Sequence, residues 1–444
     1  MQKNGIKLLT NFVSIIDSYQ KNVIINNMEN LQQEHRREQF KQEAMFPSNP
    51  KWNNAIMRAG NLTRKEFDVR SEFERDYNRI LNSTAYSRLK HKTQVFFATT
   101  NDHVCTRIEH VNIVASVAKT IARSLGLNIE LVEAIAFGHD LGHSPFGHHG
   151  ERIIAQIMQE EKLNAPFWHE KNSLRVVDYI ETLPNAKGEH ENLALTYAVR
   201  DGIVCHCCEV DENGLKPRNE LIDLNTMTKG QCMPYTYEGC VVKISDKLAY
   251  IGRDIEDASL YGLFTQRDYI TLKQIAQNFT KRKVNLKQIN PTSLIYQLVT
   301  DLCTNSTPET GLNFSKENFE LMGQIKRFVF EKVCMNKRLE PFMAYSNLVI
   351  RTIYKVLKDY YDGENTIKRL KKHTKIYPLM ITDFRKWLIK YSNIDEEFRA
   401  KRKYKNKILY NINNYDDYRQ AIIDFISCMT DKYIMKIYDD LITF

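Results

Sequence analysis

Apolar residues in this chain of 444 residues recur mostly at spacings of three and four, and clean alternation of apolar and polar residues is almost absent. Only 17 glycines and 11 prolines interrupt the pattern. Spacings of three and four place apolar side chains on one face of an α-helix, whereas alternation would indicate a strand. The sequence therefore predicts an all-α fold of many helices. Its 43% of hydrophobic residues can fill a large core, which argues against wholesale disorder.

The same pattern divides the chain into three predicted regions. Residues 1–59 form an N-terminal helical extension, because an amphipathic segment over 6–25 is followed by a polar stretch. Residues 60–260 form the main domain. Residues 261–444 stay helical in pattern but turn basic in patches, so we expect a second helical region that could serve regulation or oligomerisation. Residues 211–231 lose the periodicity and gain turn residues, which predicts a long loop.

Charge and cysteine usage narrow the class of protein. The chain has 63 Lys and Arg against 54 Asp and Glu, and a net charge of +9 favours an anionic partner such as a nucleotide or nucleic acid. No apolar run approaches the roughly 18 uninterrupted residues of a membrane span. Asn11 and Asp17 interrupt the N-terminal segment where a signal peptide would stay apolar. Nine scattered cysteines fit reduced thiols. We therefore expect a cytoplasmic protein without membrane association.

The segment FGHDLGHSPFGHHGE, residues 137–151, holds four of the 12 histidines. His139 continues the apolar face of the preceding predicted helix, so both His139 and the adjacent Asp140 should be buried. A buried carboxylate is costly unless a cation compensates it, and a divalent metal does so directly. Imidazole and carboxylate together suit Mn, Fe, Co, Ni, Zn or Mg. The segment therefore indicates part of a metal site.

Two other stretches could complete that site. His110 lies one helix upstream, and Arg107 precedes it by three residues on the same face. This face therefore offers an imidazole as a metal ligand and a guanidinium group that can bind a phosphate through two hydrogen bonds. Downstream, Asp246, Tyr250 and Asp254 follow at i, i+4 and i+8 and form a polar stripe on an otherwise apolar helix. Each of these residues taken alone would more often have a structural role. Their order along the chain favours a common site.

That order, with His110 first, then His139 and Asp140, then Asp246, resembles the HD superfamily of metal phosphohydrolases. The flanking sequence is similar to one branch, the dGTPase-like deoxynucleoside triphosphate (dNTP) triphosphohydrolases. The resemblance is strong over residues 60–260 and thin elsewhere. It implies a helical HD-domain enzyme that hydrolyses a dNTP to deoxynucleoside and inorganic tripolyphosphate and thereby controls dNTP pools. The segments that carry it include RIEH (107–110), HDLGHSPFGHHGE (139–151), WHEKNSLRVV (168–177) and SDKLAYIGRDIEDA (245–258).

The resemblance also implies a metal ion and a set of catalytic residues. Mn²⁺ or Mg²⁺ is the expected ion, and Fe, Co, Ni or Zn are alternatives. Its implied ligands are His110, His139, Asp140 and Asp246. The implied catalytic residues are the pair His148 and Glu151, joined by His143 and His169 near the α-phosphate. Motif spacing assigns the catalytic role to His148 and leaves the adjacent His149 a structural or exposed role.

Substrate contacts and partners follow from the same resemblance. A homo-oligomer is expected by family habit. The basic patches around Lys368 and Arg402 are either solvated faces or a site for a regulatory dNTP or single-stranded DNA, with nearby tyrosines as stacking surfaces. The implied contacts to the triphosphate are Arg107, Lys247 and Tyr250, and those to the deoxyribose are Gln94 and Asp254.

Three alternatives stay open at this point. The first is another HD phosphohydrolase, such as a nucleotide phosphatase. The second is an HD protein that binds nucleic acid or senses nucleotides without turnover. The third is a structural zinc centre in addition to the first metal site. The cysteines lack the CxxC spacing that is usual in zinc sites, so buried reduced thiols are favoured over a zinc centre. The residues that would supply this zinc centre are Cys205, His206, Cys207, Cys208, Cys232 and Cys240.

Overall fold

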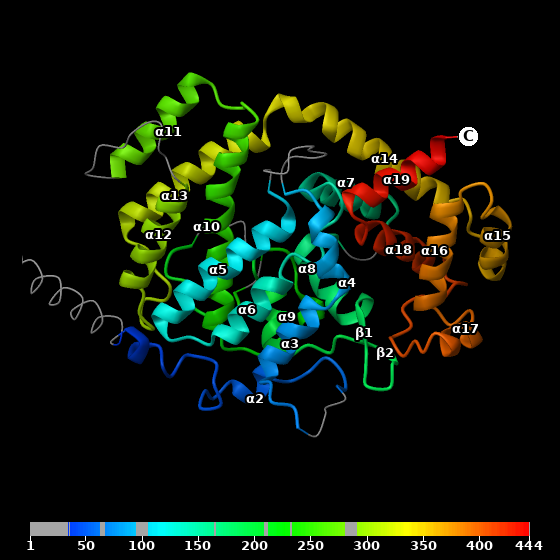
Figure 1. Cartoon of the computed structure of the whole chain (residues 1–444), viewed down its shortest axis with the longest axis horizontal. Coiled ribbons are helices and arrows are strands. Elements are labelled where there is room, and N and C mark those ends of the chain that lie inside the picture. Colours follow the sequence, from blue (N-terminus) through cyan, green and yellow to red (C-terminus); the bar gives the residue numbers. More distant parts are fainter. Residues whose placement is uncertain are drawn as a thin grey trace, which may run out of the picture.

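The fold is almost entirely helical, as Figure 1 shows, and the predicted all-α class is confirmed. Among the described residues no helix combines the length and apolar character that a bilayer crossing needs. The predicted helix over 6–25 lies outside the described residues, as do Cys208 and Cys232. The computed structural model describes residues 34, 36–62, 67–94, 105–163, 166–207, 212–230, 233–279 and 291–443.

One small hairpin is the exception to the helical pattern in the described part of the chain. Strand β1 (Thr182–Pro184) pairs antiparallel with β2 (His190–Asn192), and Leu183 lies opposite Glu191. The predicted loop over 211–231 is confirmed over 212–230, where a 3₁₀ turn at Leu224–Thr226 is the only helical element and Leu215 forms an isolated β-bridge with Leu312.

The helices of the first half surround the site. Helix α10 is the longest of them and packs along α5, while α6 packs against α3, α5, α9 and α10. These helices are α2 (Trp52–Ala55), α3 (Glu72–Leu81), α4 (Thr84–Arg88), α5 (Arg107–Leu125), α6 (Ile129–Gly138), α7 (Gly147–Glu160), α8 (His169–Arg175), α9 (Tyr197–Val204) and α10 (Tyr237–Leu260).

Local signals set the ends of the two helices that precede the histidine-rich segment. Helix α5 begins with a capping box between Thr106 and Glu109, and it ends at Gly126, whose φ of 75° is in the left-handed region. The side chain of Asn128 then accepts a hydrogen bond from the backbone N–H of Leu131 and caps α6. These boundaries determine where α6 ends and the chain continues at His139.

The helices of the second half lie on two sides of this core (Figure 1). Helices α12 and α13 pack against α10, whereas α14 packs on α7, α18 and α19. The second-half helices are α11 (Gln266–Phe279), α12 (Pro291–Asn305), α13 (Lys316–Val329), α14 (Glu340–Lys358), α15 (Thr366–His373), α16 (Pro378–Tyr391), α17 (Glu396–Lys401), α18 (Tyr415–Ser427) and α19 (Asp431–Ile442).

Buried polar contacts join the C-terminal helices to the first half. At the start of α19, the carboxylate of Asp431 accepts hydrogen bonds from the backbone N–H groups of Thr93 (2.7 Å) and Phe146 (2.9 Å). On α18, Asp424 accepts a charged hydrogen bond from Arg175 of α8 at 2.6 Å. Both contacts reach loops or helices that carry predicted site residues, so the C-terminal helices help to position the site.

Candidate metal and catalytic centre

Helices α5, α6 and α10 bring three of the predicted ligands together. His110, His139 and Asp246 each offer a ligand atom within 4.8 Å of the others. The Nε2 atom of His110 lies 2.9 Å from Oδ1 of Asp246, and Nε2 of His139 lies 3.9 Å from the same oxygen. Two ligand atoms at right angles on an ion with bonds of 2.1 Å are about 3 Å apart. These distances therefore suit a shared cation. With Asp140, these residues are called the ligand group below.

The orientation of His139 supports this interpretation. The His139 side chain is fully buried, and its Nδ1–H donates to the backbone carbonyl of Ala136 at 2.6 Å. Its Nε2 atom lies 3.6 Å from Oδ2 of Asp140 and has no hydrogen-bond partner within the described part of the chain. A buried ring nitrogen without a partner is unfavourable, and metal-ligating histidines typically donate their other N–H to a carbonyl or carboxylate. The residues present therefore fit a divalent metal ion.

Asp140 connects the ligand group to Arg107. Its Oδ2 accepts a hydrogen bond from Nη1 of Arg107 at 2.6 Å, and its Oδ1 lies 3.3 Å from Nε2 of His143. Burial alone would raise the pKa of Asp140, but the positive charge of Arg107, supported by the neighbouring histidines, holds this pKa well below its usual value. Asp140 is therefore an anion. Arg107, a predicted triphosphate contact, is buried and paired with a predicted ligand.

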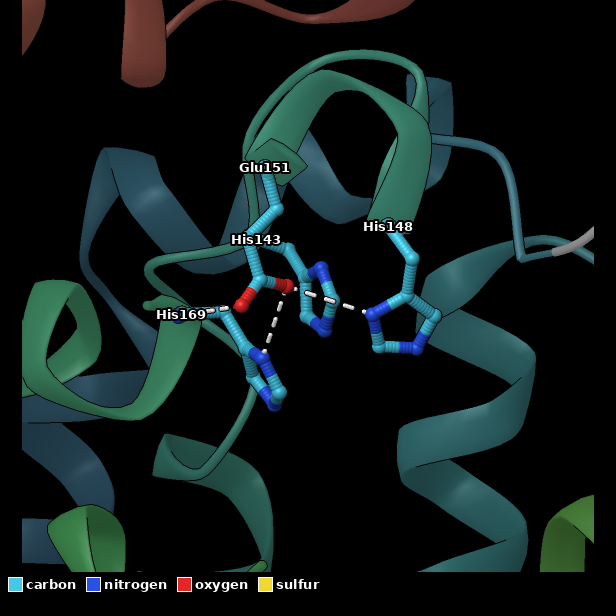
Figure 2. Close-up of side chains that lie close together, drawn as sticks. All are labelled: His143, His148, Glu151 and His169. Atoms are coloured by element: carbon cyan, nitrogen blue, oxygen red, sulfur yellow. Dashed lines mark hydrogen bonds and ion pairs between the residues drawn. The ribbon is translucent and has the colours of Figure 1, made fainter. Parts of the chain in front are cut away.

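A second constellation, drawn in Figure 2, comprises His143, His148, Glu151 and His169 and is called the histidine–glutamate cluster. Oε2 of Glu151 accepts hydrogen bonds from Nδ1 of His148 (3.2 Å) and Nδ1 of His169 (3.1 Å). The ring of His143 stacks on that of His169, with centroids 4.1 Å apart. The four predicted catalytic side chains are thus in mutual contact, while their catalytic role stays a prediction.

Burial, hydrogen bonds and neighbouring charges give the members of this cluster different charges. Burial would raise the pKa of Glu151, but hydrogen bonds from His148 and His169 outweigh it and hold this pKa well below its usual value. Burial opposes protonation of His169, yet the charge of Glu170 together with the hydrogen bond and charge of Glu151 raises the pKa of His169 to about 9. Burial and the charge of Arg107 keep the pKa of His143 well below the usual value. The cluster thus contains an anion, a cation and a neutral imidazole.

The structure distinguishes the two adjacent histidines as motif spacing predicts. Helix α7 begins at Gly147, so His148 and Glu151 lie one turn apart. The side chain of His148 is 67% exposed at the edge of the cluster. His149 points elsewhere, where its Nδ1 contacts Arg152 and its ring packs edge-on against Phe342. Only His148 of this pair reaches Glu151.

Close backbone contact positions His169 opposite α7. A side chain on Gly142 would collide with the backbone of α8, because a Cβ there would lie 2.0 Å from the nitrogen of Ser173. The Ser173 hydroxyl accepts from the Gly142 N–H (2.9 Å) and donates to the carbonyl of His139 (2.7 Å). Asn172 donates to the Gly142 carbonyl. These bonds dock α8 on the histidine-rich turn.

The predicted substrate contacts lie around the ligand group. Asp254 and Lys247 are buried on α10, and Tyr250 is half-buried between them. Burial, opposed by the charge of His110, raises the pKa of Asp254 to about 7, and its Oδ1 has no hydrogen-bond partner among the described residues. The buried Oε1 of Gln94 also lacks one there, and the Gln94 carbonyl lies 3.5 Å from Nη2 of Arg107. Two buried acceptors to which no described residue donates are therefore present beside the centre.

Sequence reasoning missed one member of the centre, His206. It lies just after α9, is 1% exposed, and its ring centroid is 4.9 Å from that of His139 and 5.4 Å from that of His169. Burial, reinforced by the charges of His139 and His169, lowers the pKa of His206 to about 3. The signal that could have revealed it is its position: like His139, it follows the end of an apolar helix.

The cysteines do not form the alternative zinc centre within the described chain. There, no group of metal-ligand type contains two cysteines. Cys207 instead lies with His169 and Glu170, and Cys205 contacts Asp201 with an Sγ to Oδ1 distance of 3.7 Å.

The basic patches of the second half are largely on the surface. Lys368, Lys371 and Lys372 are exposed on α15. Arg399 differs because it is buried and donates to the carbonyls of Lys390 and Asn406, so it belongs to the core rather than to a patch. Of the tyrosines expected to offer stacking surfaces, Tyr354 is buried.

Comparison with known proteins accounts for this arrangement. Residues 107–251 match the HD domain family. The chain is 36% identical over 374 residues to a deoxyguanosinetriphosphate triphosphohydrolase-like protein of Caldanaerobacter subterraneus subsp. tengcongensis, covering 84% of this chain and 86% of the relative. It is 32% identical over 383 residues to a protein of the same description from Clostridium tetani, covering 86% and 88%. A third such relative, from Rickettsia bellii, is 30% identical over 383 residues, covering 84% and 92%.

The chain belongs to this dGTP triphosphohydrolase-like family of HD-domain proteins. The expected resemblance is confirmed, and with the ligand group it makes the protein a metal-binding hydrolase of the HD type. The HD match contains the ligand group and the histidine–glutamate cluster, whereas Gln94 and Asp254 lie just outside it.

Proposed function

We propose that this protein is a cytoplasmic enzyme that hydrolyses deoxynucleoside triphosphates, dGTP or a broader set, to deoxynucleoside and inorganic tripolyphosphate. The observation that carries the proposal is the continuity of two constellations. Asp140 of the ligand group lies 3.3 Å from His143, which stacks on His169 of the histidine–glutamate cluster. Cleavage of a phosphate ester needs both a cation for the phosphate and a group that moves protons, and here the two adjoin. The names of the relatives support the choice of substrate.

The ligand group would hold a divalent ion, Mn²⁺ or Mg²⁺ in the first instance. When bound, such an ion polarises a phosphate oxygen and lowers the pKa of a bound water. Arg107 keeps Asp140 anionic and fixes one of its oxygens through the bond at 2.6 Å. The chain therefore supplies a ligand that is already charged and oriented.

Proton transfer is assigned to the histidine–glutamate cluster. Glu151 binds the Nδ1 atoms of His148 and His169, so the Nε2 atom of each ring is directed away from the carboxylate. The exposed His148 would exchange its proton with solvent and act as general acid or base at the 5′ oxygen, with Glu151 orienting the ring. His169, held positively charged, would offset the negative charge of the α-phosphate, and His143 would lie beside it.

Recognition of the substrate is assigned to the residues around the ligand group. Arg107, Lys247 and Tyr250 would contact the triphosphate. Gln94 and Asp254 would contact the deoxyribose. The 3′ hydroxyl, the only free hydroxyl of that sugar in a dNTP, would donate a hydrogen bond to one of their two buried acceptor atoms, because a buried acceptor without a donor is costly. By the same family resemblance we expect a homo-oligomer.

The test is product analysis. Purified protein is incubated with each dNTP and NTP, singly and in mixtures, with Mn²⁺ or Mg²⁺, and the phosphate product is identified by ³¹P NMR or ion chromatography. We expect tripolyphosphate and deoxynucleoside in equal amounts. Orthophosphate or pyrophosphate would instead indicate another HD phosphohydrolase. Binding of nucleotide without any product would indicate a sensor.

A further inference from the structure

His206 repeats, at the end of α9, the arrangement of His139 at the end of α6. The Nδ1–H of each ring donates to the carbonyl three residues earlier, Ala136 for His139 and Ile203 for His206, and both distances are 2.6 Å. This bond fixes the tautomer, since a nitrogen that donates leaves the lone pair on the other one. His206 therefore presents an Nε2 lone pair from a buried, fixed ring, as His139 does.

The two rings face the same carboxylate. His139, Asp140 and His206 each offer a ligand atom within 4.8 Å of the others, and all three are buried. Because Nδ1 of His206 is engaged by Ile203, the atom that it offers is Nε2. This histidine group shares His139 with the group of His110 and Asp246. A ring nitrogen has one lone pair and binds one ion, so an ion that uses His139 together with Asp140 and His206 would be the same ion that His110 and Asp246 hold.

We propose that His206 is a fifth protein ligand of this ion, an inference that rests on the metal-binding part of the proposed function. The complete set is then three imidazoles and two carboxylates. Five protein ligands leave one position on a six-coordinate ion, which either a phosphate oxygen or a water can occupy at a given time, whereas catalytic zinc sites typically use three protein ligands. Three imidazoles also disfavour Mg²⁺, which prefers oxygen ligands. The set therefore selects a six-coordinate transition ion such as Mn²⁺, Fe²⁺ or Co²⁺.

The experiment measures metal binding rather than turnover. Metal-free wild type, His206→Ala and His206→Gln are titrated with Mn²⁺ by electron paramagnetic resonance, and the visible spectrum of each is recorded with Co²⁺. His373→Ala is the matched control, because Nδ1 of His373 also contacts a backbone carbonyl, that of Arg369, on remote helix α15. We expect both His206 variants to bind Mn²⁺ at least about 10-fold more weakly and to change the Co²⁺ bands, and His373→Ala to match wild type.

Folding is checked by circular dichroism, and His206→Gln decides if His206→Ala does not fold, since glutamine nearly keeps the volume and a polar contact to Ile203. Unchanged Mn²⁺ affinity and Co²⁺ bands in a folded His206 variant would overturn the inference. A weaker affinity with unchanged bands would also overturn it, because a residue that only packs beside the site can weaken binding without leaving the ion. Failure to release tripolyphosphate from a wild type that binds metal would instead reject the proposed function alone.

Discussion

The ligand group and the histidine–glutamate cluster adjoin in one centre, but they differ in how far apart their residues lie in the sequence and in how exposed they are. His110 and Asp246 are 136 residues apart and meet only because α5 and α10 pack along each other. The cluster lies within residues 143–169, on α7, α8 and the turn before them. His110, His139 and Asp140 of the ligand group are buried and Asp246 is half-buried, whereas the cluster reaches solvent at His148. An ion held by the ligand group would therefore lie in a largely buried frame, whereas a proton on His148 could exchange with solvent.

Removing one carboxylate of the ligand group should have the largest effect. We expect Asp140→Ala to reduce turnover to background and to weaken metal binding, because the remaining ligands lose an anion and the buried Arg107 loses its partner. The measurements are bound metal per chain and tripolyphosphate release. Asp416→Ala, at an exposed carboxylate on α18, is the control. Full metal content and full activity in Asp140→Ala would reject the HD interpretation of the centre.

Substitution of His148, the exposed member of the cluster, should separate the effect on catalysis from the effect on metal binding. For His148→Ala we expect a fall in kcat on the order of 10² to 10⁴, the usual range for a lost general acid or base, with metal affinity unchanged. His149→Ala is the matched control, since His149 contacts Arg152 and Phe342 instead of Glu151. If His149→Ala lost this rate and His148→Ala kept it, the assigned register of the motif would be wrong.

A smaller loss should follow at the sugar end. Asp254→Ala should reduce kcat/KM by about 10- to 100-fold, which corresponds to losing one hydrogen bond to a buried polar group. A 3′-deoxy substrate should lose a similar factor with wild type and little more with the variant, because the same contact is already absent. The comparison is a cycle of two proteins and two substrates. Losses that simply multiply would mean that Asp254 does not contact the 3′ hydroxyl.

Features of the centre that depend on residues close together in the sequence could be predicted. The ends of α5 and α6 and the pairing of His148 with Glu151 follow from caps, a left-handed glycine and a spacing of three, all of which are local. The order of the ligand residues indicated a shared site because the family resemblance supplied the long-range contacts.

Features that depend on unrecognised packing were not predicted. His206 approaches His139 only because α9 packs on α6, a contact that no local pattern indicates. The cysteines beside His206 indicated a zinc centre as an alternative instead. Asp431 reaches Thr93 from 338 residues away. The strands of the hairpin have three residues each, too few for alternation to appear.

The alternative in which the basic patch on α15 binds a regulatory nucleotide or single-stranded DNA predicts an effect that is smaller still and absent from basal turnover. The triple variant K368Q/K371Q/K372Q removes three exposed charges remote from the centre. We expect a few-fold change in activation by a second nucleotide or in binding of single-stranded DNA, and a weaker salt dependence of that binding. Activity is measured with and without the second nucleotide or an oligonucleotide at two ionic strengths. Superimposable curves for variant and wild type would show that this face is only solvated.

The last effect should fall on stability and leave turnover unchanged, at the junction of the helices that carry the ligand group. Oε1 of Glu238, on α10, accepts hydrogen bonds from the backbone N–H groups of Met45 (2.8 Å) and Asn128 (3.0 Å), the residue that caps α6. No described residue donates a hydrogen bond to its Oε2, and burial raises the pKa of Glu238 from 4.5 to about 7. Between these two values the unfolded chain releases the proton while the folded chain keeps it, so the wild type loses stability as pH rises through this range.

Glu238→Gln removes this titration and keeps the Oε1 acceptor. The free energy of unfolding of the variant should match wild type near pH 5 and exceed it by up to about 3 kcal/mol at pH 8, because one pKa unit corresponds to about 1.4 kcal/mol. Urea denaturation at the two pH values measures the difference, and Glu220→Gln, at an exposed carboxylate, should show none. Metal affinity should stay at the wild-type value, since Glu238 holds the helices and not the ion. A variant less stable than wild type at pH 8 would mean that the carboxylate is charged and favourable at this junction.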